Sequence, residues 1–484
     1  MNIIGPILHF GRIRKSAPAL TDGIGTITYG ELAGLVLRTA GHLIDLGVRR
    51  GDRIGLCLKD TCDHVILLLA VAHMGGVAVP LDWRARPAEN VRFIDGLGLQ
   101  YILAEPDRRV EGGALAFLVD ARWHERVSQA DLYADSSSDW NDAFVISASS
   151  GSTGFPKFTL MTHQQYFFAM AGMFELMALK GCHRFLCNMP LYYSGGRNSC
   201  LAHLLRGDCV VLYPNLFSPA EYLDVVRRER ITVAGLVPTT MRQLLTIERD
   251  GPLLPELDLL FSTGAPLYPE EKRQAARKLT PNFHERYGTA ETLAISVLRP
   301  EDFDTRPDSV GQPHSLAEIQ VVDENDRNVS VRDAGRLRYR GPGLGSPLPG
   351  GAELSFRNGW YYPGEIARLD DEGYIFLLGR TSDVIMRGGA KIYPAEIEAM
   401  LIEHPSVIEA AVIGQRGPDN EEAVIAFVVA PGGDTGELLA HCRGRLTAYK
   451  VPRQIHFVDL LPKNTGGKID KVALGRRFVV NASL

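Results

Sequence analysis

The sequence has no marked excess of charge of one sign, no repeat of fixed period and no low-complexity tract. Its 484 residues include 52 Lys and Arg against 57 Asp and Glu, for a net charge of −5. This balance does not indicate a nucleic-acid-binding surface, which normally presents clustered basic residues. With 45% hydrophobic residues the composition is that of a globular protein, and the length exceeds what one hydrophobic core usually organises. We therefore expect two or more folding units and no nucleic-acid partner.

Cysteine is scarce and shows no metal-binding pattern. There are seven cysteines, an odd number, and no pair stands at zinc spacing with further ligands. We expect all seven to be reduced thiols in a cytoplasmic protein. The first residues, "MNIIGPILHFGRIRK", carry their basic residues after the apolar run, whereas a secretory signal carries them before it.

Only one stretch is apolar enough to suggest a membrane span, residues 64–81. Two histidines, the Gly75-Gly76 pair and Pro80 interrupt it. A buried helix over residues 60–75 followed by a buried strand explains this pattern better than a bilayer span. We therefore expect no transmembrane segment here.

Short β-type segments alternate with helical ones over most of the chain. Alternation of this kind over hundreds of residues is typical of α/β layers with largely parallel sheets. The helix over 218–231 has Ser218 as its expected N-cap. The expected strands are 52–58, 76–81, 141–149, 208–214, 231–238 and 257–264.

The character of the chain changes after residue 310, where Gly and Pro become frequent between short strand-like pieces. From "GRTSDVIMRGG" onward the pattern indicates a compact α+β unit of about 100 residues, a usual domain size. We predict a boundary near residue 380, with a first domain over 1–380 and a second over 381–484.

The stretch "SSGSTGFPK", residues 149–157, follows an expected buried strand. Glycines allow backbone amides to converge on an anion, the hydroxyls add donors, and Lys157 adds a full positive charge. Such a loop suits a polyphosphate, although its composition alone fits a flexible surface loop equally well. It is not a Walker A motif, because Gly151 and Gly154 are three apart and Pro156 precedes the lysine.

This stretch resembles the phosphate-binding loop of the adenylate-forming enzymes, which include acyl-CoA synthetases, amino-acid adenylation domains and luciferases. That loop reads close to [ST]-S-G-[ST]-T-G-x-P-K. The resemblance extends over residues 25–475 and includes the other signatures of the family in order. These are "TYGELAG" (28–34), "NMPLYYSGG" (188–196), "STGAPL" (262–267), "YGTAE" (287–291), "GWYYPGEIARLDDEGYIFLLGRTSD" (359–383), "RGGAKIYPAEIE" (387–398), "YKVP" (449–452) and "LPKNTGGKIDK" (461–471).

The resemblance implies a fold class and a function. The expected fold is α/β, with a large multilayer αβαβα N-terminal domain that includes a distorted β-barrel, and a small mobile α+β C-terminal domain. The implied activity is conversion of a carboxylic acid and ATP to acyl-AMP and pyrophosphate, followed by thioester formation. The implied cofactors are ATP, Mg²⁺ and CoA, with a phosphopantetheinyl carrier protein as the alternative acceptor. A non-catalytic nucleotide-binding relative and a luciferase-like oxidase are further alternatives, and amino-acid activation is less favoured.

The resemblance also assigns roles to residues. Lys468, Glu291 and Thr153 would be catalytic, and the last two would hold Mg²⁺. Asp383 would be the hinge, and Gly388 and Gly389 would line the thiol tunnel. The ATP site would comprise Ser149, Ser150, Gly151, Ser152, Thr153, Gly154, Lys157, Gly264, Ala265, Pro266, Tyr287, Gly288, Thr289, Glu365 and Arg380. The acid pocket would comprise Tyr192, Tyr193, Ser194, Gly195, Ser262 and Thr263.

Several positions depart from the family pattern. Tyr193 replaces a common His, Ala290 a Thr, Pro363 a Thr, and Glu365 the ribose-binding Asp. Aromatic and small pocket residues favour an aryl or a short to medium acid. Phe167 and Met170 are additional pocket candidates. Arg197 could pair with a second carboxylate of the acid, but we expect it to be a surface arginine.

Overall fold

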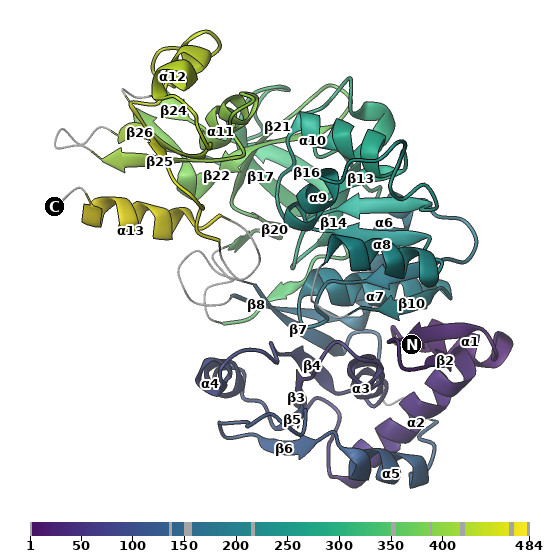
Figure 1. Ribbon diagram of the computed structural model, residues 1–484. Helices are drawn as coiled ribbons and strands as arrows, with labels where there is room; N and C mark the ends of the chain where they lie inside the picture. Colours follow the sequence, from purple (N-terminus) through teal and green to yellow (C-terminus); the bar gives the residue numbers. More distant parts are fainter. Residues whose placement is uncertain are drawn as a thin grey trace.

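The structure is a computed structural model. It describes residues 2–134, 138–149, 157–213, 218–349, 355–387, 390–416, 422–463 and 469–481. Two large sheets with helices between and around them form the first three quarters of the chain, and a smaller group of strands and helices follows (Figure 1). The α/β class predicted from the alternating pattern is confirmed.

The first large sheet has seven strands in the order β18-β8-β7-β4-β3-β5-β6, and most of its central pairs are parallel. The apolar stretch 64–81 forms a buried helix and then a buried strand here, as predicted. None of the described helices is long and apolar enough to cross a membrane. The strands are β3 (Arg53–Cys57), β4 (Val77–Pro80), β5 (Tyr101–Ala104), β6 (Leu115–Leu118), β7 (Ala143–Ser149), β8 (Lys157–Thr162) and β18 (Ser346–Pro347), with helices α2 (Tyr29–Asp45), α3 (Cys62–His73), α4 (Pro87–Gly96) and α5 (Ala121–Gln129).

The second large sheet has nine strands in the order β15-β14-β13-β12-β11-β9-β10-β1-β2. Its strands are β1 (Pro18–Thr21), β2 (Thr26–Thr28), β9 (Arg184–Cys187), β10 (Cys209–Leu212), β11 (Val233–Leu236), β12 (Leu259–Ser262), β13 (Phe283–Thr289), β14 (Leu293–Leu298) and β15 (Gln312–Pro313). Its helices are α1 (Gly5–Ile13), α6 (His163–Met177), α7 (Ser194–Arg206), α8 (Pro219–Arg228), α9 (Pro238–Leu245) and α10 (Pro269–Gln274). Ser218 is the N-cap residue of α8, as expected, although its side chain makes no capping hydrogen bond.

Helices α6 and α7 connect the two large sheets. Helix α6 contacts β7 and β8 of one sheet and β14 of the other, and α7 packs on β9, β10 and β14. Thr162 starts α6 with a capping box, because its hydroxyl accepts from the Gln165 amide at 3.1 Å while the Gln165 side chain accepts from the Thr162 amide at 2.9 Å. Both helices carry buried side chains along most of their length, as expected for helices enclosed by two layers.

A third, six-stranded sheet and the C-terminal elements complete the chain. The third sheet contains β16 (Glu318–Val322), β17 (Gly335–Arg340), β19 (Phe356–Arg357), β20 (Trp360–Tyr361), β21 (Glu365–Leu369) and β22 (Ile375–Arg380). The C-terminal elements lie together at the upper left of Figure 1. They have a hydrophobic core of their own. They are β23 (Ile385–Arg387), β24 (Ala390–Ile392), α11 (Pro394–Ile402), β25 (Glu409–Arg416), β26 (Glu422–Val429), α12 (Thr435–Arg443), β27 (Gln454–Phe457) and α13 (Lys471–Asn481).

A buried ion pair fixes α10 against β13. The Lys272 ammonium lies 2.6 Å from a carboxylate oxygen of Glu285 and donates to the carbonyls of Pro307 and Ser309 at 2.8 and 2.9 Å. All three of its donors therefore have partners. Both side chains are almost fully buried, so each charge depends on the other for compensation.

We predict that Lys272→Met will lower the free energy of unfolding by about 3–5 kcal/mol, because the Glu285 carboxylate remains buried without its partner. The neighbouring Arg273 is the matched control, since it pairs with the exposed Asp304, and Arg273→Met should cost less than about 1 kcal/mol. Urea unfolding followed by circular dichroism measures both. Equal losses in the two variants would contradict the assignment of the buried pair.

Candidate functional site

The described residues include only part of the predicted site. Ser150, Gly151, Ser152, Thr153, Gly154, Gly388, Gly389 and Lys468 lie outside them. The ends of the phosphate loop are described, because Ser149 is the last residue of β7 and Lys157 the first of β8. These two residues face each other across the antiparallel pair, so the loop joins adjacent strands at the carboxyl end of β7. The Lys157 ammonium donates to the Ser355 hydroxyl at 3.2 Å.

Two phenol–carboxylate pairs converge beside one another. The Tyr287 hydroxyl donates to the Glu365 carboxylate, and the Tyr361 hydroxyl donates to the Glu291 carboxylate at 2.8 Å. Burial raises the pKa of both tyrosines well above the usual value, and the neighbouring carboxylates raise it further. Both phenols therefore remain donors at neutral pH. Arg380 lies directly opposite Glu365 in the pairing of β21 with β22, so the predicted Tyr287, Glu291, Glu365 and Arg380 lie together, with Tyr361, for which the sequence analysis gave no role, beside them.

Two glycines at the predicted nucleotide site allow backbone arrangements that a residue with a side chain would not: a positive φ at Gly264 and a close approach of neighbouring backbone at Gly288. Gly264 begins the turn with Ala265 and Pro266 after β12 and has φ of +98°, which side-chain-bearing residues rarely adopt. A Cβ at Gly288 would lie 1.8 Å from the carbonyl oxygen of Leu293, so only glycine fits there. The turn and the strand end that carries Gly288 belong to the neighbouring strands β12 and β13.

The predicted acid-pocket residues come from two elements. Tyr192 and Tyr193 lie against each other with ring centroids 4.3 Å apart, immediately before α7 starts at Ser194. Arg84 covers the Tyr192 ring, with its guanidinium carbon 5.3 Å from the ring centroid. Ser262 ends β12 and is fully buried.

Two expectations about individual side chains are wrong. Arg197 is not at the surface: it is 1% exposed and donates to the Ser147 hydroxyl at 2.6 Å and to the Tyr192 carbonyl at 3.2 Å. It therefore ties α7 to β7. Phe167 does not line the acid pocket; it is 40% exposed and packs against Trp140, with ring centroids 5.2 Å apart. The α6 turn that carries it faces outward at that residue.

Arg286 is a site candidate that the sequence analysis missed. It lies on β13 between Glu285 and Tyr287, and the pleat sends its side chain to the opposite face of the strand. Its guanidinium carbon lies 3.9 Å from the centroid of the Phe261 ring, and Nη2 donates to the Ser199 hydroxyl at 3.3 Å. The sequence did contain a signal for it, because an arginine stands within a segment that forms a strand whose neighbouring residues are buried.

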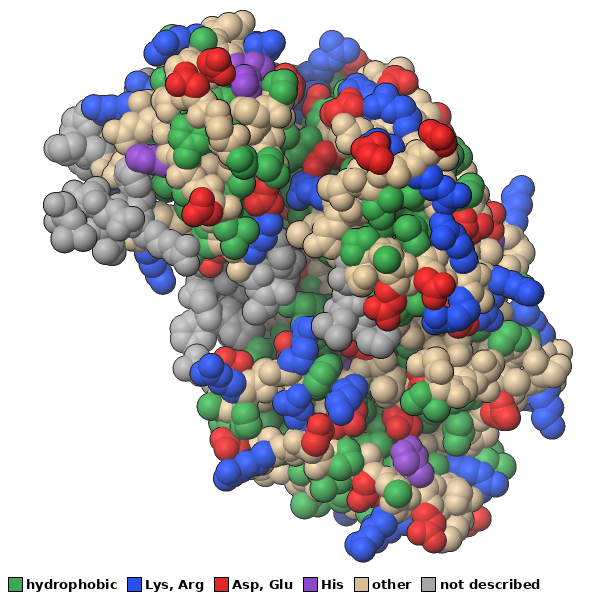
Figure 2. All heavy atoms as spheres, in the orientation of Figure 1, with side chains coloured by type: hydrophobic (Ala, Val, Ile, Leu, Met, Phe, Trp, Pro, Cys, Tyr) green, Lys and Arg blue, Asp and Glu red, His purple; other side chains and the backbone are tan. Residues whose placement is uncertain are grey.

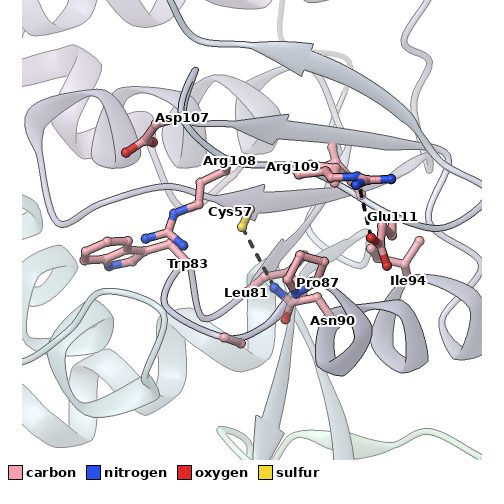
Figure 3. A pocket seen from close by; sticks show the side chains of 13 residues that line it. Cys57, Leu81, Trp83, Pro87, Asn90, Ile94, Asp107, Arg108, Arg109 and Glu111 are labelled. Atoms are coloured by element: carbon pink, nitrogen blue, oxygen red, sulfur yellow. Dashed lines mark hydrogen bonds and ion pairs between the residues drawn. The ribbon is translucent and has the colours of Figure 1, made fainter.

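A separate cavity of about 240 Å³ opens at the carboxyl ends of β3, β4 and β5 (Figure 3). Arg108 lies over the Trp83 ring at 5.0 Å, and the Asn90 amide points toward the Cys57 thiol. Among its described lining residues are none of the predicted site residues. On the face shown in Figure 2, basic and acidic side chains are interspersed, as the near balance of charge implies.

Comparison with known proteins identifies the family. The family model for AMP-binding enzymes matches residues 10–347, and the model for their C-terminal domain matches residues 396–468. The chain belongs to the AMP-binding enzyme family. A feruloyl-CoA synthase from Amycolatopsis sp is 31% identical over 96% of this chain and 97% of the synthase. A 2-succinylbenzoate–CoA ligase from Bacillus licheniformis is 30% identical over 93% of this chain and 95% of the ligase.

Solved structures of the AMP-binding enzyme family agree with this chain in fold. ATP-bound MatB from Rhodopseudomonas palustris is 26% identical, with a TM-score of 0.87 over 99% of both chains. The o-succinylbenzoate coenzyme A synthetase from Bacillus subtilis in complex with AMP is 25% identical, with a TM-score of 0.84 over 96% of both chains. The resemblance to adenylate-forming enzymes is therefore confirmed, and the protein is an AMP-forming acid–thiol ligase of the acyl-CoA synthetase type.

The cysteines of this AMP-binding enzyme are all unbonded, and six of the seven are buried. Burial raises the pKa of the Cys57 thiol to about 11, so it stays protonated at neutral pH although it lines the cavity. We predict that Ellman's reagent will label one thiol rapidly in the folded protein, the exposed Cys182, and seven after unfolding. Cys182→Ser should abolish the rapid phase. A rapid phase that persists in this variant would show that a buried thiol is accessible.

Proposed function

We propose that the protein activates an aryl or a short to medium carboxylic acid with ATP and transfers the acyl group to CoA. The observation that carries the proposal is the convergence of the Tyr287–Glu365 and Tyr361–Glu291 pairs in a chain of the AMP-binding family. A carboxylate oxygen of the acid attacks the α-phosphorus, and the bond to pyrophosphate breaks. The thiol sulfur of CoA then attacks the acyl carbon, and AMP leaves.

All reacting groups of the first step are anionic, so the protein must offset their repulsion. Lys157 at the end of the phosphate loop, the loop amides and Lys468 supply the positive charge in this proposal. Glu291 and Thr153 would hold Mg²⁺ in this proposal. Glu291 fits this role because it is a buried carboxylate, and Tyr361 orients it by donating to Oε2. The metal, when bound, would neutralise charge on the phosphate oxygens.

The nucleoside would lie between the turn after β12 and the Tyr287–Glu365 pair. Glu365 is one methylene longer than the Asp usual in the family, and its carboxylate accepts a hydrogen bond from the Tyr287 hydroxyl. One carboxylate oxygen is thereby fixed, and the group can still accept hydrogen bonds from a ribose diol. Tyr287 offers its ring to the adenine, and Arg380 adds positive charge opposite Glu365.

We also propose a domain boundary near residue 380, with Asp383 as the hinge and Gly388 and Gly389 beside the thiol tunnel. Asp383 ends a short 3₁₀ turn after β22 and lies 3.7 Å from the Lys471 ammonium. An exposed ion pair, Lys391 to Glu324 at 2.6 Å, joins the β23–β24 hairpin to the third sheet. Rotation about the hinge would remove Lys468 and admit the thiol.

The named relatives support an aryl acid and CoA, since they are a feruloyl-CoA synthase and a 2-succinylbenzoate–CoA ligase. The seven unbonded cysteines support a reducing compartment, and we propose the cytoplasm.

Incubation with ATP, Mg²⁺, CoA and pooled acids, followed by mass spectrometry, tests the reaction. Acyl-AMP without acyl-CoA would favour a carrier protein over CoA as the acceptor, and absence of both products would overturn the proposal.

Removal of the Glu365 carboxylate should weaken ATP binding. We predict that Glu365→Ala raises the KM for ATP about 10- to 100-fold, because charge-assisted hydrogen bonds to the ribose are lost. Glu365→Asp should retain most of the affinity. Pyrophosphate exchange at varied ATP measures the effect. Glu372→Ala is the matched control, because Glu372 is an exposed carboxylate paired with Arg306 beside the same sheet; a similar KM change in it would count against the ribose role.

Substitution of Lys468 should slow the first half-reaction and spare the second. We predict that Lys468→Ala slows acyl-AMP formation about 100- to 1000-fold, the usual cost of removing one preorganised charge from a transition state. Thioester formation from supplied acyl-AMP should be retained within a few-fold of wild type. Lys463→Ala, in the same signature but paired with Glu409 at 2.6 Å, is the control and should spare both steps. Equal losses in both half-reactions of Lys468→Ala would contradict the two-orientation mechanism.

A further inference from the structure

The cavity at the carboxyl ends of β3, β4 and β5 combines apolar side chains with a guanidinium (Figure 3). Arg108 reaches it from the segment that follows β5, and its guanidinium lies over the Trp83 ring. The apolar part of the lining belongs to one hydrophobic cluster and includes Cys57, Leu81, Ile94 and Ile102. A ligand in this cavity would therefore contact both hydrocarbon and a cation.

Two donors that line the cavity are buried without a hydrogen-bond partner among the described residues. They are Nε of Arg108 and Nε1 of Trp83. The two side chains form a stacked pair, with the Arg108 guanidinium carbon 5.0 Å from the Trp83 ring centroid. No acceptor of the described lining residues is buried without a partner. Because an unpaired buried donor has lost its water without replacement, the cavity suits a ligand group that accepts hydrogen bonds.

The charge of Arg108 is not compensated either, whereas the neighbouring cations have carboxylate partners. Lys59 pairs with Asp107 at 3.4 Å, and Arg109 pairs with Glu111 at 3.6 Å. Among the described residues, no ion pair includes Arg108. A group that only accepts hydrogen bonds and carries negative charge is a carboxylate or a phosphate.

The size and the apolar lining distinguish between these two groups. The cavity measures about 240 Å³. A cavity of about 150 Å³ holds one benzene ring, so a ring with one carboxylate fits here. Inorganic phosphate would leave the hydrocarbon of the lining in contact with water, whereas a ring would cover it.

From these contacts we infer that the cavity is a second ligand site, separate from the catalytic site, for a small carboxylate with an apolar body about the size of one ring. Arg108 binds the carboxylate through charge-assisted hydrogen bonds, and Trp83 Nε1 donates one more. The ring of the ligand packs on the apolar lining.

One segment connects this cavity with the predicted acid pocket. Arg84 directly follows Trp83, lies over the Tyr192 ring at 5.3 Å and donates to the Tyr192 hydroxyl. A ligand bound in the acid pocket would therefore also disturb Trp83, through Tyr192 and Arg84. Binding in the cavity has to be distinguished from this indirect route.

Benzoate is the probe, because it is a ring with one carboxylate. Benzamide has the same shape without the charge, and inorganic phosphate has the charge without the ring. The chain has four tryptophans, so protein labelled with 5-fluorotryptophan gives four ¹⁹F signals, and Trp83→Phe identifies the signal of Trp83. Without ATP, we predict that benzoate shifts this signal saturably, with an affinity at least about 10-fold higher than that of benzamide or phosphate. Equal affinity for benzoate and either of the other probes would overturn the inference.

Substitutions at three arginines locate the bound probe. Arg108→Met should weaken benzoate binding at least about 10-fold, and Arg108→Lys should keep part of the affinity. Arg109→Met is the matched control, because Arg109 is adjacent, exposed and paired with Glu111, and it should leave the affinity unchanged. Arg84→Met removes the connection to Tyr192 and should leave the Trp83 shift in place.

Two further outcomes would overturn the inference. A Trp83 shift that is lost in Arg84→Met and kept in Arg108→Met would place benzoate in the acid pocket. Displacement of benzoate by saturating CoA would assign the cavity to the acceptor thiol. Neither outcome would affect the proposed function, which is tested by the formation of acyl-AMP and acyl-CoA.

Discussion

The pleat of β13 is the constraint on which the site depends. Consecutive residues of a strand point to opposite faces, so Glu285 and Tyr287 share one face and Arg286 occupies the other. Glu285 is joined to Lys272 inside the protein, which fixes the strand against α10. Because the strand is fixed there, Tyr287 is held against Glu365 and Arg286 against α7. A shift of one residue in register would exchange the faces that now carry Tyr287 and Arg286.

The distribution of charge follows the chemistry that the family performs. Carboxylates that could bind metal or ribose are held by neutral phenols, whose high pKa keeps them as donors. A cationic partner would neutralise these carboxylates and compete with the metal. Among the described cations near these carboxylates, Lys157 lies at the end of the phosphate loop, Arg286 on the inner face of β13, and Arg380 opposite Glu365 in the β21–β22 pair.

Much of the fold and part of the site could be predicted from the sequence. Alternating apolar segments specify the α/β class, and the interrupted apolar stretch at 64–81 correctly predicts a buried helix and strand. Family signatures give Tyr287, Glu291, Glu365 and Arg380, which the structure places close together, but assign no role to Tyr361, which donates to Glu291. Arg197 and Arg286 could not be placed in this way. Their environment is set by α6, α7 and both large sheets, and no local sequence pattern indicates that Arg197 on α7 faces β7 or that Arg286 on β13 faces α6 and α7.

The Lys391–Glu324 ion pair would have to break in the proposed rotation of the C-terminal elements. It is exposed on both sides, so breaking it costs at most about 1 kcal/mol, which corresponds to less than a tenfold change in a rate. An ion pair this weak would favour one orientation of the C-terminal elements without preventing their rotation. Ionic strength would then change the contribution of this pair to the lifetime of the joined orientation only slightly.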